Sequence, residues 1–564
     1  MVLVKNKFLP LRHKGDILFL LLALLATLGS ARNLAEISEV DPWFHNLDMD
    51  MHNMVDALLI NSGFSAGTFD QPGVPMKNLL ALDYRMTHRF GHLTAWNLGE
   101  FDALENPLAA VPRLMSIGRS HSRVLVAAFL LAVGLTIYGL CRSVRAAALG
   151  VILMAGSSGL LFQGLLTRPE LLCAFFGQIL AFFCMSRGIQ LGRSAVAGIW
   201  FAAAGLCVGF SILDKLPGLI YLVIYGGWAA LDTMSHSRLA GEAETQPTGR
   251  WPGWLTDTFL IVLPSGATYC WTNLLWHGST GLEAIEVSRL HFVSVTLVAG
   301  ALLIYLPLPC QWRNGWQTSL RRCLLLASGA VAALPLSYLF LRITLSERSA
   351  SNYICYVIHT VIQPSGVISA YAANQHMFAE FGKFIGHDLW LIGLALLGTI
   401  LTCVFIPGQR PIKTASAVLL VTAFGMAMLM AKRYFILSYV IFTQVPLLLV
   451  ITLCVYATME AIDRWITSKF SMAGWAGAML VACALIFTGD LRLKREYSAY
   501  QGFSETSNQI EFIYRNGTLS GAYRLLMQKH YGNEAGFEKS LNTMMAKTRG
   551  DATLGTGAMG TVDR

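Results

Sequence analysis

The sequence predicts an all-α integral membrane protein with about 13 transmembrane helices. Hydrophobic residues make up 54% of the 564 residues, and the mean hydropathy is +0.53. Only 13% of the residues are charged, whereas soluble domains carry roughly 25%. The apolar residues also gather in runs of the roughly 20 residues that a helix needs to cross a bilayer. These observations exclude a soluble multi-domain enzyme, a disordered chain, a coiled coil and a disulfide scaffold.

The apolar runs define the predicted spans. They lie at about 16–31, 121–140, 145–165, 170–186, 195–213, 216–232, 254–276, 291–309, 323–342, 388–406, 413–431, 434–457 and 472–489. Most of the 11 cysteines fall inside these runs without paired spacing, so we expect no structural disulfide. Basic residues stand singly between the runs, which disfavours binding to nucleic acid.

Lysine and arginine predict how the chain is oriented. With a cytoplasmic N-terminus, the inner loops carry 17 positive charges and the short outer loops carry 5, as the positive-inside rule requires. The first run could also pass for a signal peptide, but its removal would leave twelve spans starting outside, so we expect an uncleaved helix. We therefore expect a bacterial inner-membrane protein with a periplasmic C-terminus; a eukaryotic member would face the endoplasmic reticulum lumen.

Long outer segments divide the chain into three regions. Residues 1–276 form an N-terminal membrane module with seven spans and a large outer loop at 32–120. Residues 277–489 form a second module with an outer loop at 343–387, and residues 490–564 form a small outer C-terminal region. Within the first loop, apolar stretches predict short interfacial helices at 54–60, 79–86 and 106–117.

The polar chemistry lies at the predicted outer surface. No Asp, Glu, Lys or Arg lies near the middle of a predicted span, which disfavours an ion-coupled transporter. Asp48 and Asp50 are two residues apart in the first outer loop. In an extended or turn conformation, both face one cation or one substrate hydroxyl. The alternative is that these acids only solvate the loop.

Cations also occur in tight outer turns, where the orientation rule makes them the exception. Arg168 and Lys215 occupy two such turns, and Lys432 and Arg433 occupy a third, followed by Tyr434. Cations fixed at the headgroup level suit a lipid phosphate. The alternative is that they are interfacial anchors with snorkelling side chains.

The order of these motifs resembles a known family. An acidic motif follows the first span, and a Pro-rich turn (Gln71 to Pro75) lies some twenty residues later. Then come Arg168-Pro169-Glu170, a glycine-containing segment from Gly205 to Gly218 that includes Asp214-Lys215, and Lys432-Arg433-Tyr434. This order is similar to that of the C-type superfamily of membrane glycosyltransferases, which use polyprenyl-phosphate sugars. The nearest groups are bacterial lipid A aminoarabinose transferases and protein O-mannosyltransferases.

The resemblance implies a site as well as an activity. It implies transfer of a sugar to a lipid, glycan or protein acceptor by inverting single displacement. The catalytic carboxylate maps to Asp48 or Asp50, the donor phosphate to Lys432, Arg433, Tyr434, Lys215 and Arg168, and the substrate to His52, Asp70 and Glu170. No cofactor is established by the residues, although Asp48 and Asp50 are compatible with a divalent cation. The rival functions are a transporter or flippase of lipid-linked sugars and a polysaccharide polymerase or ligase.

Overall fold

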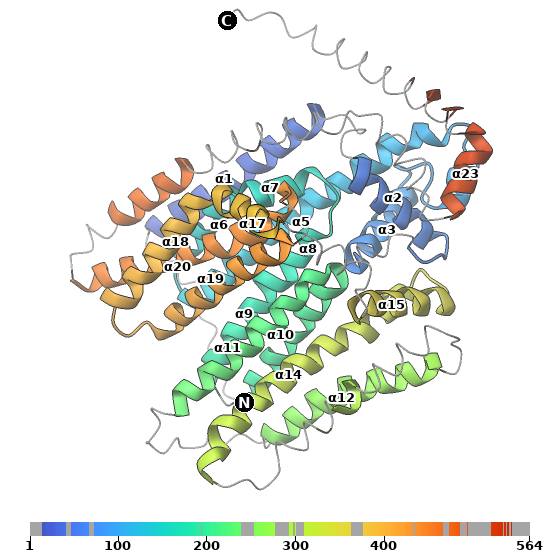
Figure 1. The fold of residues 1–564 in the computed structure, drawn as a ribbon. Coiled ribbons are helices and arrows are strands. Elements are labelled where there is room, and N and C mark those ends of the chain that lie inside the picture. Colours follow the sequence, from blue (N-terminus) through green and yellow to red (C-terminus); the bar gives the residue numbers. More distant parts are fainter. Residues whose placement is uncertain are drawn as a thin grey trace, which may run out of the picture.

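A computed structural model describes most of the predicted membrane region. Every regular element in the described part is a helix (Figure 1). The described residues are 14–40, 47–66, 73–192, 194–237, 253–276, 293–296, 299, 310–362, 376–432, 435–465, 473–484, 493, 521–533, 535–536, 539–540 and 543.

Seven helical segments of the described part are long and apolar enough to cross a membrane, or up to nine if each of two bent pairs is one span. The seven are Asp16–Ala35, Pro107–Cys141, Glu170–Gln190, Val196–Asp214, Gln317–Leu341, Arg410–Ala431 and Leu437–Asp463. A multi-pass membrane protein is therefore confirmed. The full count of 13 stays a prediction, because most of the predicted span at 291–309 lies outside the described residues.

The bundle is built from the following elements. They are α1 (Lys14–Val40), α5 (Val111–Cys141), α6 (Val144–Ala155), α7 (Ser158–Leu165), α8 (Glu170–Ala174), η2 (Phe175–Leu180), α9 (Ala181–Gln190), α10 (Ala195–Asp214), η3 (Leu216–Gly218), α11 (Leu219–Ser237), α12 (Gly253–Trp276), α14 (Cys310–Leu341), α17 (Met377–His387), α18 (Leu389–Phe405), α19 (Arg410–Ala431), η4 (Leu437–Tyr439) and α20 (Ile441–Trp465). Elements far apart in sequence pack together, as α6 does with α1 and α20.

Two helix pairs are bent. The span expected at 145–165 is two helices, α6 and α7, at 61° to each other. Helix α17, in the segment predicted as the loop 343–387, meets α18, the span expected at 388–406, at 75°. Gln444 of α20 joins both bends. Its Oε1 accepts hydrogen bonds from Ser157 Oγ (2.8 Å) and Gly159 N (2.9 Å), while its Nε2 donates to Asp388 Oδ1 (2.8 Å). The Gln444 side chain thus forms hydrogen bonds with polar groups that have no partner within the broken helices.

Helices α10 and α14 cross at small residues. A Cβ built on Gly205 would lie 1.9 Å from Leu326 O, and one on Gly329 would lie 2.0 Å from Ala202 O. Such contacts let two backbones approach closely, as at small-residue interfaces within membranes. Gly205, which opens the glycine-containing motif, therefore has a packing role in this structure.

Replacing Gly205 or Gly329 by valine is expected to separate α10 from α14 and lower the melting temperature of the purified protein. The added side chain meets backbone oxygen, which cannot rotate away, and overpacking typically costs about 1–3 kcal/mol. Gly226→Val is the matched control, because a Cβ on Gly226 meets nothing within 4 Å. Equal melting temperatures for all three variants would contradict this view of the crossing.

The segment predicted as the first outer loop folds into a second hydrophobic core beside the bundle. It contains α2 (Leu47–Asn61), α3 (Val74–Arg89), α4 (Leu98–Asp102) and η1 (Pro107–Ala110), with α15 (Glu347–Ile362) and α23 (Gly521–Tyr531) packed against them. The helices expected at 54–60 and 79–86 are confirmed as parts of α2 and α3. The separate helix expected at 106–117 is a correction: Pro107 begins a helical turn that continues directly into α5.

Helix α23 packs on this second core. Lys529 Nζ lies 2.7 Å from Asp102 Oδ2, and His530 Nε2 lies 3.1 Å from Asp102 Oδ1. Tyr531 donates its hydroxyl hydrogen to Asn106 Oδ1 at 2.9 Å. The hydrogen bond from Lys529 lowers the pKa of the Asp102 carboxyl below its ordinary value. The second core and α23 therefore lie on one side of the molecule (Figure 1).

We expect Asp102→Asn to loosen α23 and to speed its cleavage by limited proteolysis at pH 7. Because the pKa of Asp102 is lowered, its charge favours docking above the ordinary pKa of about 4. That contribution is lost as the pH falls through the lowered pKa. The wild-type protein should therefore become more sensitive below about pH 4, and the variant should show less change. Glu105→Gln, at an exposed acid nearby, is the control; identical cleavage of the two variants would contradict the docking role.

Candidate active site

One face of α2 carries a row of polar residues into the protein. Asp50, Asn53 and Asp56 recur every three residues, so they share a face of the helix. Asp50 Oδ2 lies 2.9 Å from Arg119 Nε of α5, and Asp50 Oδ1 accepts a hydrogen bond from Thr167 N at 2.6 Å. Asn53 Nδ2 donates to Thr167 O at 2.6 Å. Helix α2 thus forms hydrogen bonds with both the backbone N–H and the backbone C=O of Thr167, in the turn between α7 and α8.

The same turn places Arg168 and Glu170 against the end of α10. Glu170 is completely buried and forms ion pairs with Arg168 (3.4 Å) and with Lys215 Nζ. The Lys215 ammonium also lies 4.7 Å from the centre of the Tyr439 ring, in the geometry of a cation–π contact. Tyr439 belongs to η4, a few residues after Lys432.

Asp214 connects this part of the site to α3. Its backbone oxygen accepts a hydrogen bond from Gly73 N (2.8 Å), and its Oδ1 accepts one from Met76 N (3.2 Å). The other carboxylate oxygen, Oδ2, is buried and has no hydrogen-bond partner in the described part of the chain. The first turn of α3 is thus tied to the end of α10.

A buried ion pair lies beside that connection. Lys77 Nζ of α3 is 2.9 Å from Asp56 Oδ2, and both side chains are at most 3% exposed. Burial raises the pKa of the Tyr353 hydroxyl, and the nearby charges of Asp56 and Asp214 raise it further. Tyr353 of α15 therefore shares this environment and stays protonated at neutral pH.

Together these residues form a buried cluster of acidic and basic side chains. It has four carboxyl groups and four basic groups, each on a residue that is at most 4% exposed. We call it the charge cluster; its members are Asp50, Asp56, Lys77, Arg119, Arg168, Glu170, Asp214 and Lys215. Burying so many charges is costly unless they are paired, and breaking a buried pair typically costs about 3–5 kcal/mol. Such a cluster can offer cations to a phosphate and a carboxylate to a hydroxyl group.

The structure brings together several residues that the sequence selected. Asp50, Arg168, Glu170 and Lys215 all belong to the charge cluster. His52 lies partly buried on α2, and Lys432 is an exposed residue at the end of α19. Asp70, Arg433 and Tyr434 lie outside the described residues.

The expected conformation of the acid pair is a correction. Asp48 and Asp50 lie in helix α2, not in an extended segment or turn. A cation shared by the two acids stays a prediction, because the Asp48 side chain lies outside the described part of the structure. Within the described ranges, no three His, Cys, Asp or Glu side chains are placed to hold a metal ion.

Sequence reasoning missed four members of the charge cluster as site residues: Asp56, Lys77, Arg119 and Asp214. A usable signal existed for Asp56, because the spacing of Asp50, Asn53 and Asp56 follows a helical face. Arg119 had no such signal, since its partner Asp50 is 69 positions away.

Comparison with known proteins shows that most of this cluster lies in a segment that matches a family model. Residues 67–272 match the model of the family described as dolichyl-phosphate-mannose-protein mannosyltransferase. Six of the eight residues of the charge cluster lie in this segment; Asp50 and Asp56 precede it. No curated protein matches the chain.

Solved structures of an archaeal oligosaccharyltransferase also match. One is AglB from Archaeoglobus fulgidus in complex with an inhibitory peptide and a dolichol-phosphate, at 13% identity and a TM-score of 0.43, covering 88% of this chain and 58% of that one. Another is the Archaeoglobus fulgidus oligosaccharyltransferase complex with Zn and sulfate, at 13% identity and a TM-score of 0.41, covering 88% and 56%. This chain thus spans little more than half the length of those proteins. The family match, which rests on residues 67–272, confirms that the chain is similar to the C-type membrane glycosyltransferases.

Proposed function

We propose that the protein transfers a sugar from a polyprenyl-phosphate donor to a lipid, glycan or protein acceptor at the outer face of the membrane. The observation that carries this proposal is the overlap between the charge cluster and the matched segment, which holds six of its eight charged residues. The family description names a dolichyl-phosphate-linked mannose and a protein. For this chain we propose only the class of donor.

The cations of the cluster suit the phosphate of the donor. Arg168 and Lys215 share Glu170 as their partner, so two positive charges converge on a single carboxylate. A donor phosphate that approaches this pair gains two charge-assisted contacts, one of them from a guanidinium that can hold two oxygens. Tyr439, whose ring contacts the Lys215 ammonium, lies only a few residues after Lys432 in the chain. Arg433 and Tyr434 follow Lys432 directly, so we propose them as further contacts of the donor phosphate.

The reaction is a single displacement that inverts the anomeric carbon. The acceptor oxygen forms a bond to that carbon, while the bond to the phosphate oxygen breaks and leaves its electron pair on the phosphate. The acceptor proton passes to a carboxylate acting as general base. The leaving phosphate is a stable anion, so it needs cations rather than a proton donor.

Asp50 is the proposed base. Arg119 and the Thr167 N–H group stabilise the negative charge of its carboxylate. The charged carboxylate is the form that can receive a proton. Asp48, at the start of the same helix, is the alternative base. His52, Asp70 and Glu170 remain proposed substrate contacts, on the resemblance alone.

A transfer assay tests this function against its rivals. The purified protein in detergent is incubated with a polyprenyl-phosphate sugar and candidate acceptors, and mass spectrometry detects the product. Turnover without a membrane gradient supports a transferase and excludes a pure transporter or flippase. Turnover only with a diphosphate-linked donor would favour a polymerase or ligase and contradict the proposed donor.

A further inference from the structure

Helix α7 lies between two parts of the site that are far apart in sequence. Its C-terminal end leads into the Thr167–Glu170 turn, whose Glu170 forms an ion pair with Lys215. Element η4 packs on the same helix and supplies the Tyr439 ring, whose centre lies 4.7 Å from the Lys215 ammonium. Two contacts of this ammonium, one with a carboxylate and one with a ring, therefore depend on the position of α7.

One face of α7 contacts the backbone of η4 and of the start of α20. Gly159 and Gln163 are four residues apart in α7, so they share this face. A Cβ built on Gly159 would lie 2.6 Å from Ile441 N and 2.9 Å from Val440 C. The two backbones thus approach each other too closely for a side chain at position 159, which is why glycine is needed there.

Gln163 adds a hydrogen bond one turn further along that face. Its Nε2 donates to Ser438 O at 2.7 Å, and the residue is 0% exposed. Ser438 O belongs to the peptide group that joins Ser438 to Tyr439. Because a peptide group is planar, a hydrogen bond to its oxygen restricts the rotation of the whole group. The bond therefore fixes the backbone from which the Tyr439 ring reaches Lys215.

We propose that Gln163 is a positioning residue for the donor phosphate, because its hydrogen bond holds Tyr439 against the Lys215 ammonium. This role rests on the proposed function, since it needs a donor phosphate at Lys215. Gln163 is completely buried, so it acts through Tyr439 and Lys215 rather than on the donor itself. Without the hydrogen bond, η4 is free to rotate, and the ammonium is held less accurately toward the phosphate.

Gln178 provides a matched comparison. It is also 0% exposed, and its Nε2 donates to another backbone oxygen, Phe442 O, at 2.9 Å. Phe442 lies in the first turn of α20, after Tyr439. Methionine is an unbranched side chain of similar length, so replacing either glutamine by methionine removes one hydrogen bond to this part of the backbone. Only the hydrogen bond of Gln163 reaches the peptide group of Tyr439.

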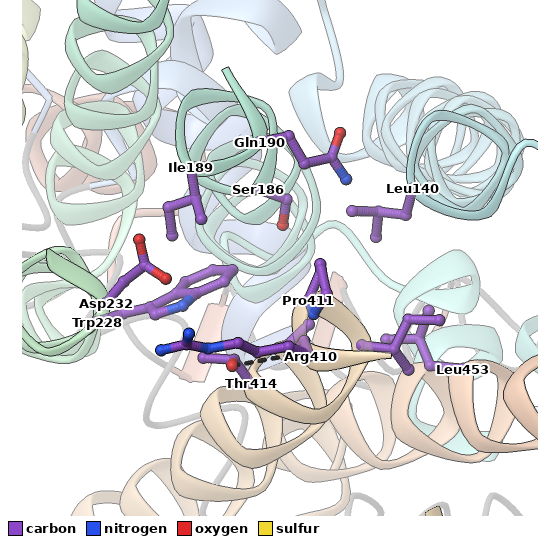
Figure 2. Close-up of a pocket in the computed structure, with 12 residues that line it drawn as sticks. Leu140, Ser186, Ile189, Gln190, Trp228, Asp232, Arg410, Pro411, Thr414 and Leu453 are labelled. Atoms are coloured by element: carbon purple, nitrogen blue, oxygen red, sulfur yellow. Dashed lines mark hydrogen bonds between the residues drawn. The ribbon is translucent and has the colours of Figure 1, made fainter. Parts of the chain in front are cut away.

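Leu453 provides a control for stability. It lies about 18 Å further along α20 than Ile441. Figure 2 shows it in the wall of a cavity of about 370 Å³, together with Leu140 and Pro411. Because Leu453 is 1% exposed, Leu453→Ala removes buried apolar contacts and should lower the melting temperature. It leaves the contact between α7 and η4 in place, so it measures what a loss of stability alone does.

Steady-state kinetics of the purified full chain, with varied donor and varied acceptor, test this role. Gln163→Met should raise the donor KM and lower kcat/KM for the donor by about three- to tenfold, no more than Tyr439→Leu. The acceptor KM should stay unchanged. In the Tyr439→Leu background, Gln163→Met should cause no further loss, because the ring that it positions is gone. Gln178→Met and Leu453→Ala should keep the wild-type donor KM.

Two kinetic results would overturn the proposal. One is a donor KM that is unchanged in Gln163→Met or that rises equally in Gln163→Met and Gln178→Met. The other is an additive loss when Gln163→Met is combined with Tyr439→Leu, since a residue that acts only through the ring cannot add to the loss of that ring.

Fluorine NMR tests the positioning without sugar transfer. 3-Fluorotyrosine is incorporated at position 439 of the full chain, and Lys215→Ala gives the shift that results from removing the ammonium. Gln163→Met should move the resonance, and so should Gln163→Asn, a milder variant with the amide one methylene shorter. Gln178→Met and Leu453→Ala should leave it within its linewidth. A resonance that neither Gln163 variant moves would overturn the proposal. A wild-type protein that transfers no sugar would overturn the proposed function, whereas the resonance would still decide the role of Gln163.

Discussion

Replacing Asp50 by asparagine is expected to lower the rate of sugar transfer by about 10²–10⁴-fold, because an amide cannot accept the acceptor proton. The same change should also lower stability, since it leaves the buried Arg119 without its charged partner. Breaking such a pair typically costs about 3–5 kcal/mol. Melting temperature and initial rates of purified protein are the measurements.

A double variant separates the two effects. Asp50→Asn combined with Arg119→Gln removes both charges of the pair, so it should regain much of the lost stability. It should not regain activity. If the double variant transfers sugar at the wild-type rate, Asp50 is a structural residue, and Asp48→Asn becomes the decisive variant.

Replacing Lys215 by alanine is expected to raise the donor KM and to lower kcat by about 10²–10³-fold, the usual effect of removing one fixed contact to a developing negative charge. Both parameters should change, because the contact made to the donor phosphate should tighten as the phosphate leaves. Steady-state kinetics with varied donor concentration measure the effect.

The ring beneath Lys215 provides a graded comparison. Tyr439→Leu removes the cation–π contact but keeps the ammonium, so its loss should be close to tenfold, in line with about 0.5–2 kcal/mol for such contacts. Lys215→Arg keeps the charge and should retain part of the activity. An unchanged donor KM and kcat in Lys215→Ala would reduce this residue to a structural role opposite Glu170.

The fold class was predictable, because long apolar runs have few alternatives in a membrane. Where helices break was not predictable from local sequence. The bend between α6 and α7 depends on Gln444, which is 287 positions from Ser157. The helical state of Asp48 and Asp50 was predictable in principle, since Leu47, Met51 and Met54 follow helical spacing.

Two cations of the candidate site were predictable because they lie in predicted outer turns, where the charge rule of the membrane disfavours them. Arg168 and Lys215 stood out for that reason. Their shared partner Glu170 was named from the resemblance, but the pairing itself joins positions 45 apart. Lys77 and Arg119 lie within helices and look like ordinary surface charges in sequence; only the packing of α3 and α5 against α2 buries them.

Photo-cross-linking of the donor tests the central claim most directly. A polyprenyl-phosphate sugar with a diazirine beside the phosphate is bound to the purified protein, irradiated, and mapped by peptide mass spectrometry. The predicted labels fall on the Thr167–Glu170 turn and the Asp214–Lys215 segment, and an excess of unlabelled donor removes them. Labels confined to other parts of the chain, with none at the charge cluster, would contradict the claim that the donor phosphate binds at the charge cluster.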